Sequence, residues 1–73
     1  MRRVEFEDLI VGNIYYDVDN VNIIPAKLML VTKTSDWCYF IGLNQVNCYE
    51  KDENGLYKFS RLHFYTQSFK FGR

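Results

Sequence analysis

The sequence predicts a mostly β fold, a small and strongly bent antiparallel barrel of five or six strands in one domain over residues 1–73. Three observations favour this fold. Residues 26–43 read as a long hairpin that is apolar on both faces, the chain contains one alanine, and turn-forming residues separate its apolar runs. A ribbon of two strands with two apolar faces must be covered by a closed barrel, a second layer or a partner chain. An OB-like barrel or a small β-sandwich is the alternative fold.

The central hairpin is predicted from two runs of β-branched, aromatic and aliphatic residues, 27–33 and 37–43. They flank a Ser-Asp pair at 35–36, whose side chains suit a turn. Gly42 in such a strand marks a sharp bend or a bulge, which helps a small sheet to curl. The expected register pairs Thr32 with Tyr39, Leu30 with Ile41, and Leu28 with Leu43.

Short strands separated by turn residues account for the rest of the chain. In chain order we expect a single helical turn at 6–9, a tight turn at 11–13, strands at 14–18 and 46–51, a turn at 52–55, a strand at 56–61, and a last strand at 64–71 that closes the sheet against the first. Alternation in the first strand places Tyr15 and Asp17 on one face and Ile14, Tyr16 and Val18 on the other.

Residues 6–15 also contain a spaced pattern, Phe-x-x-Leu-x-x-Gly-x-x-Tyr, from Phe6 to Tyr15. This pattern resembles the beginning of small SH3-like barrels, in which a glycine turn leads into the first strand. The resemblance implies an SH3-like barrel as the fold. It implies no functional residue.

Residues 19–25 form the longest irregular stretch, in which Asn and Asp favour turns and Pro25 cannot donate a ladder hydrogen bond. Two interpretations of its aliphatic side chains remain open. They plug one end of the barrel, or Ile23 and Ile24 are presented to a partner.

The composition limits the kinds of partner. Nine basic and nine acidic residues give zero net charge, so no global field would steer the protein onto nucleic acid or an anionic membrane. No apolar run approaches the roughly 18 residues of a membrane span, and the start lacks a signal pattern. Two cysteines do not make a disulfide framework. We therefore expect a cytoplasmic protein with reduced thiols and no membrane partner.

Motifs for catalysis, metals and cofactors are missing from the sequence. It contains no phosphate-binding loop, no dinucleotide-binding glycine pattern and no nucleophile elbow. His63 is the single histidine, and Cys38 and Cys48 lack metal-ligand spacing. We therefore expect a protein that is not an enzyme and that holds neither cofactor nor metal.

The favoured function is binding to a protein partner, because Tyr, Trp and Arg are enriched in interface hot spots. Pairing of two copies is included, since a homo-oligomer would cover the second apolar face of the hairpin. The short, Asn-, Lys- and Tyr-rich chain also resembles small accessory proteins of tailed bacteriophages, which modulate or inhibit host proteins. The candidate partner-binding residues are Trp37, Tyr39, Tyr15, Tyr49, Ile23 and Ile24.

The alternative function is binding of single-stranded RNA or DNA by the C-terminal third, where rings alternate with positive charges. Aromatic side chains stack on bases and neighbouring cations contact phosphates. The zero net charge argues against this alternative. Its candidate residues are Tyr57, Lys58, Arg61, His63, Tyr65, Lys70 and Arg73.

Overall fold

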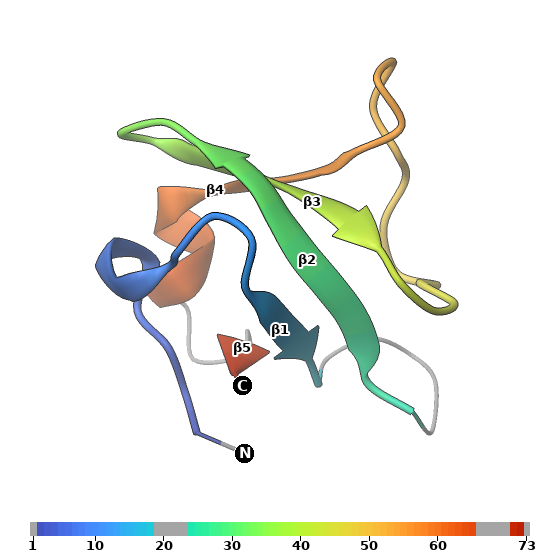
Figure 1. Cartoon of the computed structure of the whole chain (residues 1–73), viewed down its shortest axis with the longest axis horizontal. Coiled ribbons are helices and arrows are strands. Elements are labelled where there is room, and N and C mark those ends of the chain that lie inside the picture. The colour runs from blue at the N-terminus through green and yellow to red at the C-terminus, as the bar shows by residue number, and fades with distance from the viewer. Residues whose placement is uncertain (1, 19–23, 66–70, 73) are drawn as a thin grey trace.

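Residues 2–18, 24–65 and 71–72 are described by the computed structural model, in which antiparallel strands form a single sheet (Figure 1). The strands are β1 (Ile14–Asp17), β2 (Ala26–Lys33), β3 (Trp37–Gly42), β4 (Tyr57–Ser60) and β5 (Phe71–Gly72). Two short 3-10 helices, η1 (Phe6–Asp8) and η2 (Arg61–Tyr65), precede β1 and follow β4. The order across the sheet is β4-β3-β2-β1-β5, so the last strand returns to the first.

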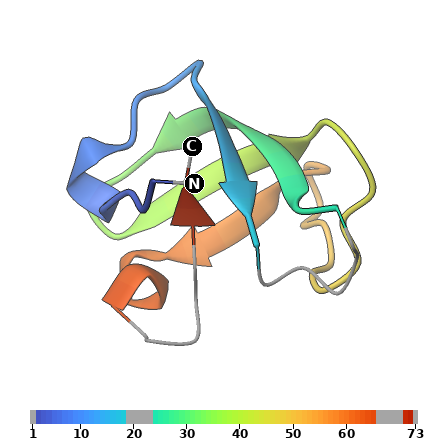
Figure 2. The ribbon, with the colours of Figure 1, turned by 90° about the horizontal axis from the view of Figure 1, so that it is seen from below.

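The mostly β class is confirmed, whereas the closed barrel is not. Strands β1 to β4 form a four-stranded antiparallel sheet, to which β5 adds two residues beside β1. The edge strands β4 and β5 do not pair with each other in the described part of the chain, so the sheet is open. Figure 2 shows this sheet from below as strongly curved.

The hairpin of β2 and β3 has the predicted register at its turn but not along its whole length. Thr32 lies opposite Tyr39, as expected. A β-bulge between Leu30 and Thr32 then inserts Val31, and Leu30 pairs with Phe40 instead of Ile41. The extra residue keeps Leu30 on the buried face and Thr32 on the opposite face, because one inserted residue reverses the alternation.

Gly42 does not mark the bulge and serves close packing instead. A Cβ atom at this position would lie 2.9 Å from a ring carbon of Tyr57 and 3.4 Å from Val46. The missing side chain therefore lets the Tyr57 ring pack directly on the β3 backbone.

The strand predicted at 46–51 is wrong, because residues 45–51 have no regular structure. Val46 and Tyr49 both pack against the core from this segment. The predicted turn that follows is present: the Gly55 amide donates to the Asp52 carbonyl at 3.0 Å, and Gly55 has a φ of 77°. Because left-handed φ values suit glycine, the sequence marks this turn clearly.

One face of the curved sheet holds the core. Buried side chains from β1 to β4 include Tyr15, Leu28, Leu30, Phe40 and Phe59. Rings meet edge to face, with centroids 5.6 Å apart for Phe40 and Phe59. The helices η1 and η2 lie side by side at one end of the sheet (Figures 1 and 2), where the Phe6 and Phe64 rings are 5.6 Å apart.

Two cations fix the N-terminal segment to this body. Lys33 donates its ammonium to the carbonyl oxygen of Phe6 at 2.8 Å and also lies 4.8 Å from the Phe6 ring centroid. Arg3 donates to the carbonyl oxygen of Phe64 at 2.9 Å and forms a backbone bridge with Gly72. Arg3 therefore links the N-terminal segment to η2 through its side chain and to β5 through its backbone.

Candidate functional site

The face of the sheet that points away from the core carries a continuous set of apolar side chains. The register aligns Ile14 with Met29 and Met29 with Ile41, which makes a row across β1, β2 and β3. Ile14 is 40% exposed and Ile41 is 38% exposed, so the row is not covered by the rest of the described chain. We call this surface the outer face and define it by Ile14, Lys27, Met29, Thr32, Trp37, Tyr39, Ile41 and Lys58.

An aromatic and basic cluster adjoins the apolar row. Tyr39 lies opposite Lys58 on β4, and Trp37 lies two residues before Tyr39, at the start of β3. The Lys58 ammonium is 4.2 Å from the centroid of the Trp37 ring and 6.0 Å from that of Tyr39. Attraction between the cation and the ring faces holds the three side chains together. Trp37 keeps 39% of its surface exposed, so the cluster is accessible from solution.

The outer face is positively charged, although the whole chain has no net charge. Alternation along β2 points Lys27 outward between buried Ala26 and Leu28, and Lys58 extends from β4. No outward-pointing strand position in the described ranges carries a carboxylate. Asp36, next to Trp37 in the chain, lies in the turn and pairs with Arg61 at 3.9 Å.

The structure brings together two of the predicted partner-binding residues, Trp37 and Tyr39. Tyr15 has no exposed surface and its ring stands edge to face on Phe40, so it is a core residue and not available to a partner. Tyr49 is half-buried, with its ring centroid 4.8 Å from that of Phe59, and belongs to the core margin.

Of the two predicted residues in the 19–25 stretch, Ile24 is described, and it precedes β2 rather than lying on a strand of the outer face. Ile24 is 67% exposed and directly precedes Pro25, whose carbonyl accepts from the Asn44 side chain at 3.0 Å. Ile23 lies outside the described residues. The two interpretations of this stretch, plug or binding loop, therefore both remain predictions.

The described members of the predicted nucleic-acid set are divided between β4 and η2. Tyr57 is buried, and Lys58 belongs to the outer face. Arg61, His63 and Tyr65 lie on η2, where Tyr65 donates to a Glu7 carboxylate oxygen at 2.6 Å. Lys70 and Arg73 lie outside the described residues.

Sequence reasoning missed the apolar row and Lys27. Ile14, Met29 and Ile41 were each placed in strands, but none was proposed as a binding residue. The cross-strand register is the signal that joins them, and it depends on a bulge that the sequence does not mark.

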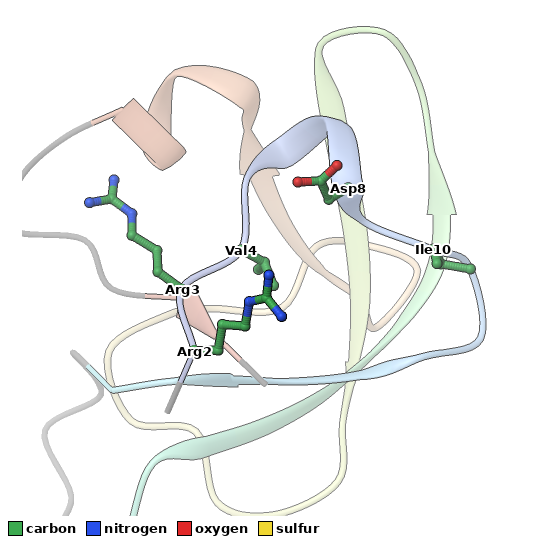
Figure 3. Close-up of a pocket in the computed structure, with 5 residues that line it drawn as sticks. All are labelled: Arg2, Arg3, Val4, Asp8 and Ile10. Carbon is green, nitrogen blue, oxygen red and sulfur yellow. The ribbon is translucent and has the colours of Figure 1, made fainter.

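A shallow pocket of about 410 Å³ lies beside the N-terminal segment and is lined by Arg2, Arg3, Val4, Asp8 and Ile10 (Figure 3). Figure 3 shows Arg3 extending away from Arg2 toward η2, where it binds the Phe64 carbonyl. One of the two guanidinium groups is therefore already engaged within the fold. The pocket lies outside the outer face and carries no further argument for a ligand.

The thiols offer little chemistry. Burial raises the pKa of the Cys38 thiol to about 12, and Cys38 donates to the Phe59 carbonyl at 3.5 Å. A buried, protonated thiol is a poor nucleophile and a poor metal ligand. Cys48 is exposed, and neither cysteine is part of a disulfide. Within the described ranges, no group of three His, Cys, Asp or Glu side chains is placed to hold a metal ion.

Comparisons with protein-family models, with curated proteins and with solved structures found no match to this chain. In the part of the chain that is described, none of the helices has the length and apolar character needed to cross a membrane.

Proposed function

We propose that this protein is a small binding module, without chemistry of its own, whose outer face binds a protein partner. The observation that supports the proposal most strongly is the apolar row Ile14, Met29 and Ile41, which remains accessible although the opposite face of the same strands fills the core. Exposed apolar patches rimmed by polar groups are typical of protein-interaction sites.

The composition of the outer face also supports a protein partner. Trp and Tyr are the residue types that dominate hot spots, and Trp37 and Tyr39 lie next to each other beside the apolar row. A rigid strand scaffold holds both rings, so little side-chain entropy is lost when a partner packs on them. A homo-oligomer formed through the same face is one form of this proposal.

The proposal also includes the finer fold type, the cellular compartment and the biological role. The return of β5 to β1 after η2 supports an SH3-like barrel as the finer fold type. Two cysteines that are not joined in a disulfide suit a reducing cytoplasm. The chain's size and composition support an accessory role, in which binding modulates or inhibits a larger host protein, as in tailed bacteriophages.

A selection from a displayed library of random peptides tests the proposed function. The wild-type protein serves as bait, and each enriched peptide is measured against Trp37→Ala and Leu62→Ala. Leu62 is a suitable control because it is exposed and apolar but lies on η2, which is not one of the strands of the outer face. We expect Trp37→Ala to weaken binding by about 2 kcal/mol or more and Leu62→Ala to leave it unchanged. Enriched peptides that are indifferent to Trp37→Ala, or no enrichment, would contradict the proposal.

Single-stranded nucleic acid is the second candidate ligand, because a cation above two rings can serve a base and its phosphate. It is less well supported, since Arg61 faces Asp36 and Tyr65 binds Glu7, which places carboxylates among the predicted contacts. Titration of labelled single-stranded and duplex oligonucleotides at low and moderate salt distinguishes the two. Salt-sensitive binding that Lys58→Gln weakens would favour nucleic acid.

A further inference from the structure

The position of Lys58 indicates which chemical group of a partner the outer face could bind. We infer that the outer face recognises a protein segment in which a carboxylate stands beside apolar side chains, with Lys58 binding the carboxylate. This inference rests on the proposed function. It adds that the partner segment carries a negative charge and that Lys58 recognises this charge.

Lys58 differs from the other fixed cations of the structure in what holds it. Lys33 and Arg3 donate to backbone carbonyls, and Arg61 faces the Asp36 carboxylate. Lys58 instead lies over the rings of Trp37 and Tyr39, and no carboxylate pairs with it among the described residues. Ring faces attract the charge but leave N–H donors available. The ammonium is therefore positioned yet still open to an acceptor.

A carboxylate is the acceptor that this arrangement favours. Charge-assisted hydrogen bonds are about twice as strong as neutral ones. The rings restrict the lysine side chain before binding, so less entropy is lost when the bond forms. Lys27 adds a second positive charge to the outer face. In the described part of the chain, the strand positions of the outer face carry no negative charge. An acidic partner is thus attracted, and a basic one repelled.

The apolar row determines what must accompany the carboxylate. Ile41 follows Tyr39 by two residues on β3 and points to the same side, roughly 6–7 Å farther along the strand. A phosphate backbone would gain nothing from Ile14, Met29 and Ile41, which offer no donors. A peptide with an acidic residue next to aliphatic or aromatic residues would bury the row and neutralise Lys58 together. This difference favours a protein segment over a nucleic acid.

A second copy of the chain fits less well as a face-to-face partner. A two-fold contact would bring the Lys27 and Lys58 pair of one copy to a surface of the same sign. Like charges at an interface are unfavourable. The mass of the protein in solution, measured for wild type and Lys58→Glu, tests this form of contact: a dimer that Lys58→Glu disrupts would overturn the inference of an acidic segment from outside the chain.

The deciding experiment uses the peptides enriched from the random library. We expect them to carry Asp or Glu next to apolar residues. Their affinity should fall about tenfold or more with Lys58→Gln, recover partly with Lys58→Arg, and stay constant with Lys51→Gln, a matched lysine exposed in the 45–56 segment. Replacing the peptide's acidic residue by its amide should reproduce the Lys58→Gln loss.

The outcomes separate the inference from the function on which it rests. Peptides that need Trp37 but lack carboxylates, or that bind Lys58→Gln as well as wild type, would overturn the inference and leave the binding face intact. Peptides that do not depend on Trp37 would overturn both. Binding of oligonucleotides with affinity that Lys58→Gln reduces, in place of acidic peptides, would also overturn the inference.

Discussion

The Lys58 ammonium lies 4.2 Å from the centroid of the Trp37 ring, on the face of the sheet opposite the core. The two residues come from adjacent strands, β4 and β3, and are not directly paired: Lys58 pairs with Tyr39, and Trp37 with Ser60. This diagonal contact joins an exposed tryptophan, a residue type enriched in hot spots, to an accessible charge. It is the structural basis for proposing that the outer face binds a protein.

Trp37→Ala should leave the protein folded but weaken partner binding by about 2 kcal/mol or more, as expected for a hot spot. The reason is that Trp37 is 39% exposed and contacts Lys58, whereas the core is built from other rings. Circular dichroism and thermal denaturation check the fold, and titration calorimetry with an enriched peptide gives the affinity. Loss of the fold would show that Trp37 is a core residue.

Phe59→Ala should have the opposite profile. Phe59 is buried, and its ring meets Phe40, Tyr49 and His63 at centroid distances of 5.6, 4.8 and 5.8 Å. Removing it should lower the free energy of unfolding by about 3–5 kcal/mol. A domain of this size has modest stability, so much of the variant should already be unfolded at the start of a urea titration, before urea is added. A loss below about 1 kcal/mol would contradict the described core.

Lys33→Met should destabilise the protein although Lys33 lies at the end of a strand near the surface. Its ammonium donates to the Phe6 carbonyl at 2.8 Å and lies 3.4 Å from the carbonyls of Glu7 and Leu9. Methionine keeps most of the apolar stem but leaves these carbonyls without the charged donor. We expect a loss of about 1–3 kcal/mol in urea unfolding. Lys51→Met, on an exposed lysine, is the control and should change stability little.

Tyr65→Phe should reduce the dependence of stability on pH in the acidic range. The hydrogen bond from Tyr65 lowers the pKa of Glu7 from its ordinary value of 4.5. A carboxyl whose pKa is lower in the folded state adds stability above its unfolded pKa, and this is lost as pH falls through the folded pKa. Melting temperatures of wild type and Tyr65→Phe should therefore differ slightly at neutral pH and converge as the pH falls below 4.5 and through the lowered pKa of Glu7.

The same bond has a consequence at high pH. It raises the pKa of Tyr65 above its ordinary value of 10.0, because the neutral phenol is the donor. Stability from this group is present below the unfolded pKa and is lost as pH rises through the folded pKa. Parallel profiles for wild type and Tyr65→Phe at both ends of the pH range would show that the bond does not form in solution.

The sequence predicted the strands best where alternation and turn residues agree. The strand β1, the hairpin of β2 and β3, and the Asp52–Gly55 turn lie where they were expected. The segment 46–51 was misassigned because Val46 and Tyr49 are three residues apart. A strand would place them on opposite faces, whereas both pack against the core from an irregular backbone.

Which face of a strand is buried was harder to predict. The alternation of β1 separated Tyr15 and Asp17 from Ile14 correctly, but both sets contain apolar side chains. A carboxylate normally indicates the exposed side, yet Asp17 is buried and Ile14 is exposed. For the same reason Trp37 and Tyr39 could be proposed from their residue types, whereas the row of Ile14, Met29 and Ile41 required the register.

An NMR titration of the ¹⁵N-labelled protein with an enriched peptide tests the central claim most directly. The outer face as the binding surface predicts that the largest amide shifts fall on Ile14, Met29, Tyr39, Ile41 and Lys58, with small changes on η1 and η2. Shifts concentrated on η2 or around Arg2 and Asp8, with the outer face unchanged, would contradict it.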